Sequence, residues 1–347
     1  MNYTTQAFDP APWCTNRHWQ TVYPSTPLYR SPTVAYEREA LELPDGDFVD
    51  IDWAGRTGRP DQTTLIVLPG LEGNSSSSYA LTIGAAAVDA GWALGVMHYR
   101  GCSGRPNRLP RRYHAGDTGD IDFLAQQLHE RQPDATLLAV GYSLGGNVLL
   151  KYLGEQGNAA VFDGAVAVCV PFDLSDSAQA LSSGPSRFYQ NFLMRRMRAS
   201  LHEKYRPEFA PFDWDRAMRA KTFYEFDDQV TAPLHGFRGV DDYYARSSCG
   251  QFIGGIRKPT LLISALDDPF MTGAAFPSAD TLPVDVRAAF SAHGGHVGFV
   301  SGRPWQPPKY WLHARTMGFY VLELGVESIC SADPTAMAMT ASETGGR

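Results

Sequence analysis

The chain has 347 residues, of which 44% are hydrophobic and 19% charged, and its formal net charge is −7. This composition is ordinary for a folded globular protein and argues against a fibrous or largely disordered chain. An acidic chain without a long stripe of lysine and arginine does not match a phosphate backbone, so nucleic acid is not an expected partner. The length predicts one large core that carries an insertion or a cap.

The sequence shows no targeting or membrane signal. No basic stretch followed by an apolar run precedes Pro12, and a run of about 18 apolar residues, the length of a membrane span, occurs nowhere. We therefore expect neither secretion nor a membrane span. The densest basic cluster, Arg195, Arg196 and Arg198, fits a solvated helix face better than a site for acidic lipid head groups.

The cysteines are scattered and form no close pair of the kind found in zinc sites and redox motifs. The five are Cys14, Cys102, Cys169, Cys249 and Cys330. An odd number of dispersed cysteines favours a reducing compartment, so the cytoplasm is the expected location.

In chain order, residues 37–53 alternate polar and apolar side chains on both sides of Pro44-Asp45-Gly46, which predicts a β-hairpin. Continuous apolar runs then predict strands buried on both faces. They cover residues 64–68, 94–97, 136–140, 165–170, 260–264 and 286–290. Helical segments are expected around 81–90, 121–131 and 145–155. This alternation predicts an α/β fold with a mostly parallel sheet covered by helices on both faces.

The long gap between the fourth and fifth apolar runs, residues 172–256, lacks strand-like runs and has helical patterning over 188–205 and 214–226. It predicts a helical cap inserted into the sheet. Residues 311–324 have helical spacing and should close the sheet from one side. The expected division is a core of 36–171 and 257–326, the cap, an N-terminal extension of 1–35 packed on the core, and a disordered tail of 327–347.

The segment Gly141-Tyr-Ser-Leu-Gly145 lies between a predicted strand that ends at Val140 and a predicted helix that begins at Leu144. A serine between two glycines at such a junction is typical of a nucleophile elbow, where the glycines permit a turn too tight for Cβ atoms. The plainer alternative is a serine in an ordinary tight connection. The pattern and its setting favour Ser143 as a nucleophile.

A serine nucleophile needs a base beside its hydroxyl and an acid that orients the base. In a fold of this kind the order along the chain is serine, acid, histidine, with the acid just past a late strand. Asp267 and Asp268 follow the strand at 260–264, and their spacing does not choose between them. Asp173, which follows an earlier strand, is the competing acid.

The base is expected in the glycine-rich loop 291–299, where His296 is the first candidate and His293 the reserve. Two histidines three residues apart could also suggest a metal site. The Gly-Gly spacer between them breaks helical registry, however, and no carboxylate-rich segment accompanies them. We expect neither a metal nor a cofactor.

The oxyanion of an acyl-transfer reaction needs backbone donors, and the loop 69–73, which follows the strand at 64–68, is placed to supply one. The Leu71 N–H and the Leu144 N–H, at the start of the predicted helix, are the expected pair. A phosphate-binding loop is excluded because no Gly-Lys-Ser/Thr follows.

Beyond the elbow, residues 8–325 carry a string of further motifs. They include Pro12-Trp13 with Asn16-Arg-His-Trp-Gln-Thr21, Leu71-Glu-Gly-Asn-Ser75, Arg100-Gly-Cys-Ser-Gly104 with Tyr113-His114, Tyr243-Tyr244 with Ser247-Ser248, Asp267-Asp-Pro-Phe270 and Gly294-Gly-His-Val-Gly-Phe299. With these motifs the chain resembles the AB hydrolase 4 family of the α/β-hydrolases, the YheT-like esterases, whose eukaryotic relatives include membrane-anchored phospholipases and acylglycerol lipases.

The resemblance implies Ser143, Asp268 and His296 as the catalytic triad, and it is what selects Asp268 over Asp267. It implies a structural role for the segment 100–117, rather than a catalytic one for Cys102 or His114. The loop entry Pro69-Gly70 departs from the family, which commonly has His-Gly there. Because the oxyanion donor is a backbone N–H, little effect is expected. Without the membrane anchor of the eukaryotic members, a bacterial-type esterase is the nearer analogue.

The sequence therefore predicts a serine carboxylic ester hydrolase that works through an acyl-enzyme on short- to medium-chain acyl or lipid esters. Acyl transfer to another acceptor on the same fold is the alternative within enzymes. A non-catalytic ligand-binding relative is the alternative outside them. Nothing in the sequence indicates the oligomeric state.

Overall fold

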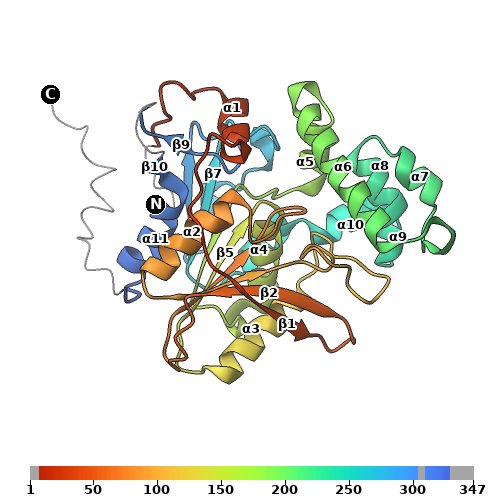
Figure 1. Ribbon diagram of the computed structural model, residues 1–347. Helices are drawn as coiled ribbons and strands as arrows, with labels where there is room; N and C mark the ends of the chain where they lie inside the picture. Colours follow the sequence, from red (N-terminus) through yellow and green to blue (C-terminus); the bar gives the residue numbers. More distant parts are fainter. Residues whose placement is uncertain (1–7, 304–308, 329–347) are drawn as a thin grey trace.

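The computed structural model describes residues 8–303 and 309–328 (Figure 1). The first seven residues of the expected N-terminal extension lie outside the described residues, as do residues 329–347 of the expected tail.

An eight-stranded sheet forms the centre of the molecule, in the order β1-β2-β4-β3-β5-β6-β7-β8. The strands are β1 (Glu37–Glu42), β2 (Phe48–Ala54), β3 (Thr64–Leu68), β4 (Ala93–Met97), β5 (Leu137–Tyr142), β6 (Gly164–Val168), β7 (Thr260–Ala265) and β8 (Val286–Ser291). The pairs β1·β2 and β2·β4 are antiparallel, and all other neighbours are parallel. The predicted hairpin and mostly parallel sheet are therefore confirmed.

Helices cover both faces of the sheet. They are α2 (Ser78–Asp89), α3 (Gly119–Arg131), α4 (Leu144–Gln156) and α11 (Trp311–Gly318), the last continued by a π-helical turn at Phe319–Glu323. Buried side chains of α3 and α4 pack into one apolar cluster with one face of the strands, and those of α2 and α11 pack into a second cluster with the other face. Every residue of β3 to β7 is buried, as continuous apolar runs predict.

The segment between β6 and β7 is helical and forms the cap. Its helices are α5 (Leu174–Leu181), α6 (Arg187–Lys204), α7 (Trp214–Arg219), α8 (Phe223–Phe226), α9 (Ala232–Leu234) and α10 (Val240–Ser247), with a π-helical turn at Asp227–Thr231. Their buried side chains form an apolar cluster of their own, and Figure 1 shows these helices, coloured green to turquoise, beside the sheet. The helical cap is confirmed; the domain boundaries at residues 172 and 256 stay a prediction.

Several predicted element boundaries were wrong, three of them for a visible reason or by two residues or more. The helix expected over 214–226 ends at Arg219, and α8 starts only at Phe223, because the side chain of Thr222 accepts a hydrogen bond from Glu225 N and begins a new helix. Strand β5 runs two residues past Val140, to Tyr142. Strand β6 stops at Val168, because the next residue, Cys169, has a φ of 50°.

The N-terminal helix α1 (Arg17–Val22) is attached to the C-terminal part of the chain, beside a small sheet of β9 (Val300–Ser301) and β10 (Lys309–Tyr310). Gln20 is fully buried, and its Nε2 donates to the carbonyls of Cys14 and Val300. Its Oε1 accepts from Val300 N at 2.6 Å. Within the described ranges, no helix is long and apolar enough to cross a membrane.

Candidate active site

Ser143 lies on the turn between β5 and α4, where its φ is 52° and its ψ is −117°. Such angles are strained for a residue with a Cβ atom and are characteristic of a nucleophile elbow. The flanking glycines make the turn possible. An added Cβ on Gly145 would lie 2.5 Å from the carbonyl oxygen of Pro69 and nearer still to that of Leu68.

Replacing Gly145 by alanine is therefore expected to lower the free energy of unfolding by about 3 kcal/mol, because backbone rather than a flexible side chain must move. Gly254→Ala is the matched control, since no atom lies within 4 Å of the added Cβ. Urea denaturation of both variants measures the difference. Equal midpoints would show that the elbow tolerates a side chain.

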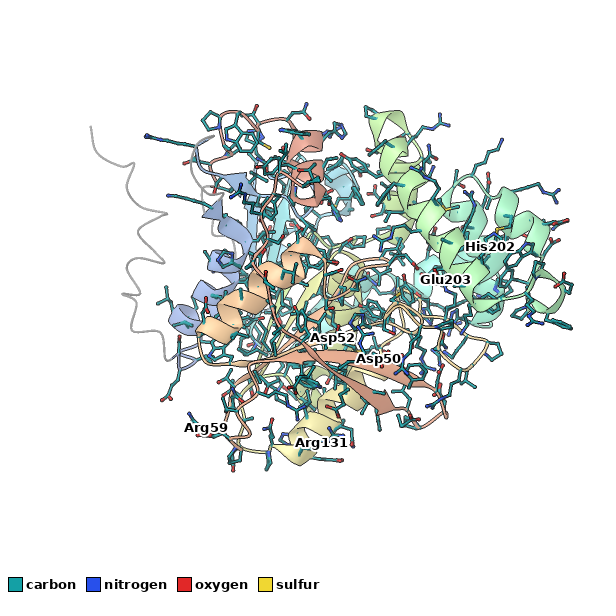
Figure 2. The ribbon with its side chains drawn as sticks, viewed as in Figure 1. Asp50, Asp52, Arg59, Arg131, His202 and Glu203 are labelled. Atoms are coloured by element: carbon teal, nitrogen blue, oxygen red, sulfur yellow. The ribbon has the colours of Figure 1, made fainter. Side chains whose placement is uncertain are left out.

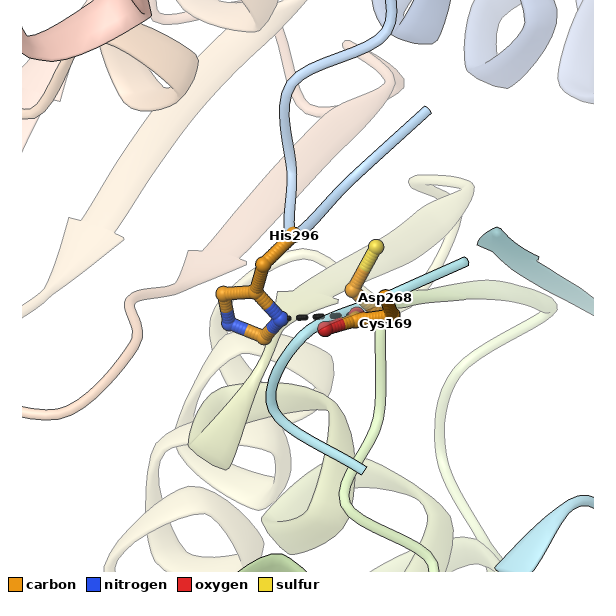
Figure 3. A group of neighbouring side chains, drawn as sticks. All are labelled: Cys169, Asp268 and His296. Atoms are coloured by element: carbon orange, nitrogen blue, oxygen red, sulfur yellow. Dashed lines mark hydrogen bonds and ion pairs between the residues drawn. The ribbon is translucent and has the colours of Figure 1, made fainter. Parts of the chain in front are cut away.

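Ser143, His296 and Asp268 form one chain of hydrogen bonds. The Nε2 atom of His296 lies 2.9 Å from Ser143 Oγ, and its Nδ1 lies 2.8 Å from Asp268 Oδ2. The Asp268 side chain is fully buried and that of His296 is 10% exposed. The three residues come from the ends of β5 and β7 and from the loop after β8, so the sheet brings them to the same edge. Figure 3 shows the hydrogen bond between Asp268 and His296.

Two further contacts fix the histidine ring. The Phe270 ring stacks on it with centroids 3.8 Å apart and an angle of 2° between the planes. Phe270 N in turn donates to Asp268 Oδ1 at 2.8 Å. The backbone N–H of His296 donates to Thr21 Oγ1, on α1, at 2.9 Å. Helix α1 and the loop after β7 therefore both hold the imidazole in place.

The competing residues lie elsewhere. The Oδ2 atom of Asp267 lies 3.3 Å from Nδ1 of His293, and its Oδ1 atom accepts a hydrogen bond from Gly295 N. This second, more exposed pair braces the loop that carries His296. Asp173 is the N-cap of α5, where its side chain accepts the backbone N–H groups of Ser175 and Asp176.

A turn at residues 70–73 faces the elbow. Gly73 N donates to Gly70 O, Gly70 N donates to Tyr79 Oη, and Glu72 N donates to Tyr113 Oη. Leu71 N is left as the one amide of this turn without an acceptor among the described residues. Leu144 N is the first amide of α4, and such N–H groups have no partner within their helix. Leu71 and Leu144 both line the cleft in which Ser143 and His296 lie.

The sequence model of the α/β-hydrolase-fold family matches residues 63–302. The chain belongs to the α/β-hydrolase family. It is 40% identical over 314 residues to YheT of Escherichia coli, which is named as a candidate esterase, and the alignment covers 89% of this chain and 91% of that protein. It is 31% identical over 308 residues to phospholipase ABHD3 of Mus musculus, over 86% of this chain and 74% of that one. The resemblance to the YheT-like branch is confirmed.

Solved structures agree with this fold. The esterase Pf2001 of Pyrococcus furiosus superposes with a TM-score of 0.54 over 84% of this chain and 92% of its own, at 14% sequence identity. At that identity the likeness shows the fold of the α/β-hydrolases alone.

The cleft of this α/β-hydrolase is largely apolar and lies between the elbow and the cap. Its volume is about 110 Å³. Besides the elbow and His296, its walls are Leu71, Ala115, Pro171, Leu174, Ser177, Ala178, Leu181, Leu193, Met197, Phe223, Asp227, Tyr243, Tyr244 and Phe270. Most of these side chains belong to the cap, so the cap forms the cleft wall opposite Ser143.

Cys169 lies close to Asp268 and His296. Within the described ranges, these three residues are the one group whose atoms could share a metal ion (Figure 3). The chemistry of the group does not fit a metal. Burial raises the pKa of the Cys169 thiol well above its ordinary value, whereas a metal ligand must be a thiolate. The Asp268 carboxylate and the His296 imidazole are already hydrogen-bonded to each other.

A second group has the same three residue types but a different geometry. Ser75 Oγ and His98 Nε2 both bond to Asp52 Oδ2, at 2.6 and 2.8 Å, so the histidine does not stand between the serine and the acid. Asp52 is a buried residue of β2, labelled in Figure 2, and Arg38 also bonds to it. This group is a structural network.

Cys102 and His114 lie apart from the serine. Burial raises the pKa of the Cys102 thiol to about 12, which leaves the thiol protonated and a poor nucleophile. His114 Nδ1 accepts the backbone N–H of Gly116. The sequence did not reveal the role of Thr21, Tyr79 and Tyr113, which hold the loops. Each hydroxyl accepts a hydrogen bond from a backbone amide of another segment, for which the local sequence has no signal.

Proposed function

We propose that this chain is a serine carboxylic ester hydrolase with Ser143 as nucleophile, His296 as base and Asp268 as the orienting acid. The observation that carries the proposal is the continuous hydrogen-bonded chain from Asp268 through His296 to Ser143 Oγ, at 2.8 and 2.9 Å. Such an arrangement recurs on unrelated folds wherever a serine attacks a carbonyl.

In the proposed reaction, His296 Nε2 takes the Ser143 proton while Oγ attacks the ester carbonyl. The developing oxyanion accepts hydrogen bonds from the N–H groups of Leu71 and Leu144. His296 then returns the proton to the oxygen of the leaving alcohol, and an acyl-enzyme remains. Water activated by His296 releases the acid and restores Ser143. Asp268 holds the ring in the tautomer that presents Nε2 to the serine, and no metal or cofactor takes part.

The proposed substrates are short- to medium-chain acyl esters or lipid esters. The cleft of about 110 Å³ is somewhat smaller than the roughly 150 Å³ cavity that holds a benzene molecule. Its apolar walls suit an alkyl chain. The names of the relatives, esterase and phospholipase, support ester hydrolysis in general. We also propose a reducing compartment such as the cytoplasm, since Cys14, Cys102, Cys169 and Cys249 are unpaired.

A series of p-nitrophenyl esters from acetate to myristate tests this proposal. For esters whose acyl-enzyme is hydrolysed more slowly than it forms, we expect a burst of nitrophenol that approaches the enzyme concentration. The value of kcat/KM should be highest for short chains and should fall once the chain is longer than the cleft. Absence of both the burst and turnover across the series would contradict the proposal. Monoacylglycerols and phospholipids extend the series to lipids.

A further inference from the structure

Next to the apolar cleft lies a small chamber that has several polar side chains among its walls. The chamber has a volume of about 30 Å³. It shares the walls Leu71, Ala115, Leu144, Met197, Asp227 and Tyr243 with the cleft. Its other walls include Glu72, Arg112, His114, Thr231 and His235. One water needs roughly 10–15 Å³, so the chamber has room for a group about the size of a water.

Asp227 stands at the boundary between the cleft and the chamber, on the π-helical turn of the cap. Its two carboxyl oxygens accept Thr231 Oγ1 at 2.6 Å and Tyr244 Oη at 2.8 Å, which leaves lone pairs on both. No arginine or lysine of the described chain pairs with it. Burial raises its pKa to about 6. A carboxyl group without a cationic partner in an apolar wall is costly unless it has a further partner.

Two uncharged histidines also line the chamber. Burial lowers the pKa of His114 and of His235 to about 3, so both rings are neutral at physiological pH. Since His114 Nδ1 accepts the Gly116 N–H, the ring carries its proton on Nε2 and is a donor there. The rings lie 4.5 Å apart, and His235 Nε2 is buried without a hydrogen-bond partner in the described chain.

The remaining charges of the chamber compensate each other. Arg112 Nη2 lies 2.8 Å from Glu72 Oε1, and both residues are buried. The chamber therefore offers an acceptor, Asp227, and a neutral donor, His114. A carboxylate would be repelled by Asp227, and an ammonium group could accept nothing from the histidine. A hydroxyl group is neutral, donates one hydrogen bond and accepts others, and has the size of a water.

The position of His296 decides which half of an ester reaches the chamber. His296 must return its proton to the leaving oxygen, so the alcohol half lies on its side of the cleft. Neither His296 nor Phe270 lines the chamber, whereas Leu71 and Leu144 line both the chamber and the cleft. The acyl half, on the side away from His296, therefore points toward the chamber.

We propose that the chamber binds a hydroxyl group on the acyl chain, so that esters of hydroxy acids are the preferred substrates. This inference rests on the proposed ester hydrolase function and names its substrate class. Asp227 is the residue that determines specificity, since its carboxyl accepts the hydrogen bond of the hydroxyl.

Pairs of p-nitrophenyl esters test the inference: butyrate with 3-hydroxybutyrate, and hexanoate with 6-hydroxyhexanoate, with methoxy analogues as size controls. Wild-type kcat/KM is expected to be about 10- to 100-fold higher for at least one hydroxy ester than for its plain partner, the range for a hydrogen bond to a charged group. Asp227→Asn should reduce this ratio, and Asp227→Leu should abolish it.

Asp228→Asn is the matched control. It removes the same charge one residue away, and Asp228 contacts Val240 N and Gln229 instead of lining the cleft or the chamber. The hydroxy-to-plain ratio should be unchanged in this variant. Propyl and 2-hydroxyethyl hexanoate form a further pair with the hydroxyl on the alcohol half, for which no preference is expected.

The wild-type protein alone can overturn the inference, whatever the stability of the variants. Equal rates within each acyl pair, or a preference confined to the alcohol half, would show that the chamber binds no acyl hydroxyl. Failure to hydrolyse any ester, plain or hydroxylated, would instead contradict the proposed hydrolase function. The two failures are therefore distinguishable.

Discussion

Ser143→Ala is expected to lower kcat by roughly 10⁴-fold or more and to abolish labelling by a fluorophosphonate probe. The variant keeps the fold but lacks the oxygen that lies 2.9 Å from His296 Nε2. What activity remains would come from binding and from the oxyanion donors. Labelling followed by gel fluorescence and ester hydrolysis at saturating substrate measure the two losses.

Ser177→Ala is the control for this change. Ser177 lines the same cleft from α5, and its hydroxyl has no hydrogen-bond partner among the described residues. Its removal should leave labelling intact. Labelling that persists in Ser143→Ala and disappears in Ser177→Ala would mean that the nucleophile has been assigned to the wrong serine.

Asp268→Asn is expected to lower kcat by about 10⁴-fold, because an amide facing Nδ1 favours the tautomer in which Nε2 cannot present its lone pair to Ser143. The carboxylate lies 2.8 Å from His296 Nδ1 and is fully buried, so water cannot replace it easily. The loss should appear in kcat with little change in KM. Comparison of thermal unfolding with the wild type separates this effect from loss of structure.

Asp267→Asn is the matched control, because it makes the same change in the preceding residue. Asp267 pairs with the more exposed His293 at 3.3 Å, and such pairs contribute about 0–1 kcal/mol. The activity should therefore stay within about tenfold of the wild type. If Asp267→Asn were the inactive variant and Asp268→Asn the active one, the acid would be Asp267.

The sequence predicted the sheet well because its buried strands are short, continuous apolar runs with no competing explanation. The elbow could be predicted for a similar reason. A serine between two glycines, placed between a strand and a helix, has few other structural explanations. The choice between Asp267 and Asp268 was different. They are adjacent, and which carboxylate faces His296 depends on the backbone path after β7, which the spacing does not encode. The family resemblance selected Asp268, and the catalytic roles stay predictions.

Other features depend on contacts between remote segments. The hydroxyls of Thr21, Tyr79 and Tyr113 hold the His296 loop and the turn at 70–73, across separations of up to 275 residues. Nothing near these residues in the sequence indicates such partners. The break between α7 and α8 did have a local signal: Thr222 and Glu225 have the spacing of a capping box, which periodicity alone overlooked.

The attachment of α1 to the histidine loop also bears on the order in which the protein becomes active. Thr21 and Gln20 bond to His296 and Val300, so this segment finds its partners only among residues synthesised 275 to 280 positions later. Contacts this distant form late, because a long loop must close before they stabilise anything. A nascent or truncated chain that ends just before His296 would contain the elbow and the eight strands of the central sheet, but it would lack the imidazole proposed to activate Ser143. Activity should thus mark the completion of folding, rather than the formation of the sheet.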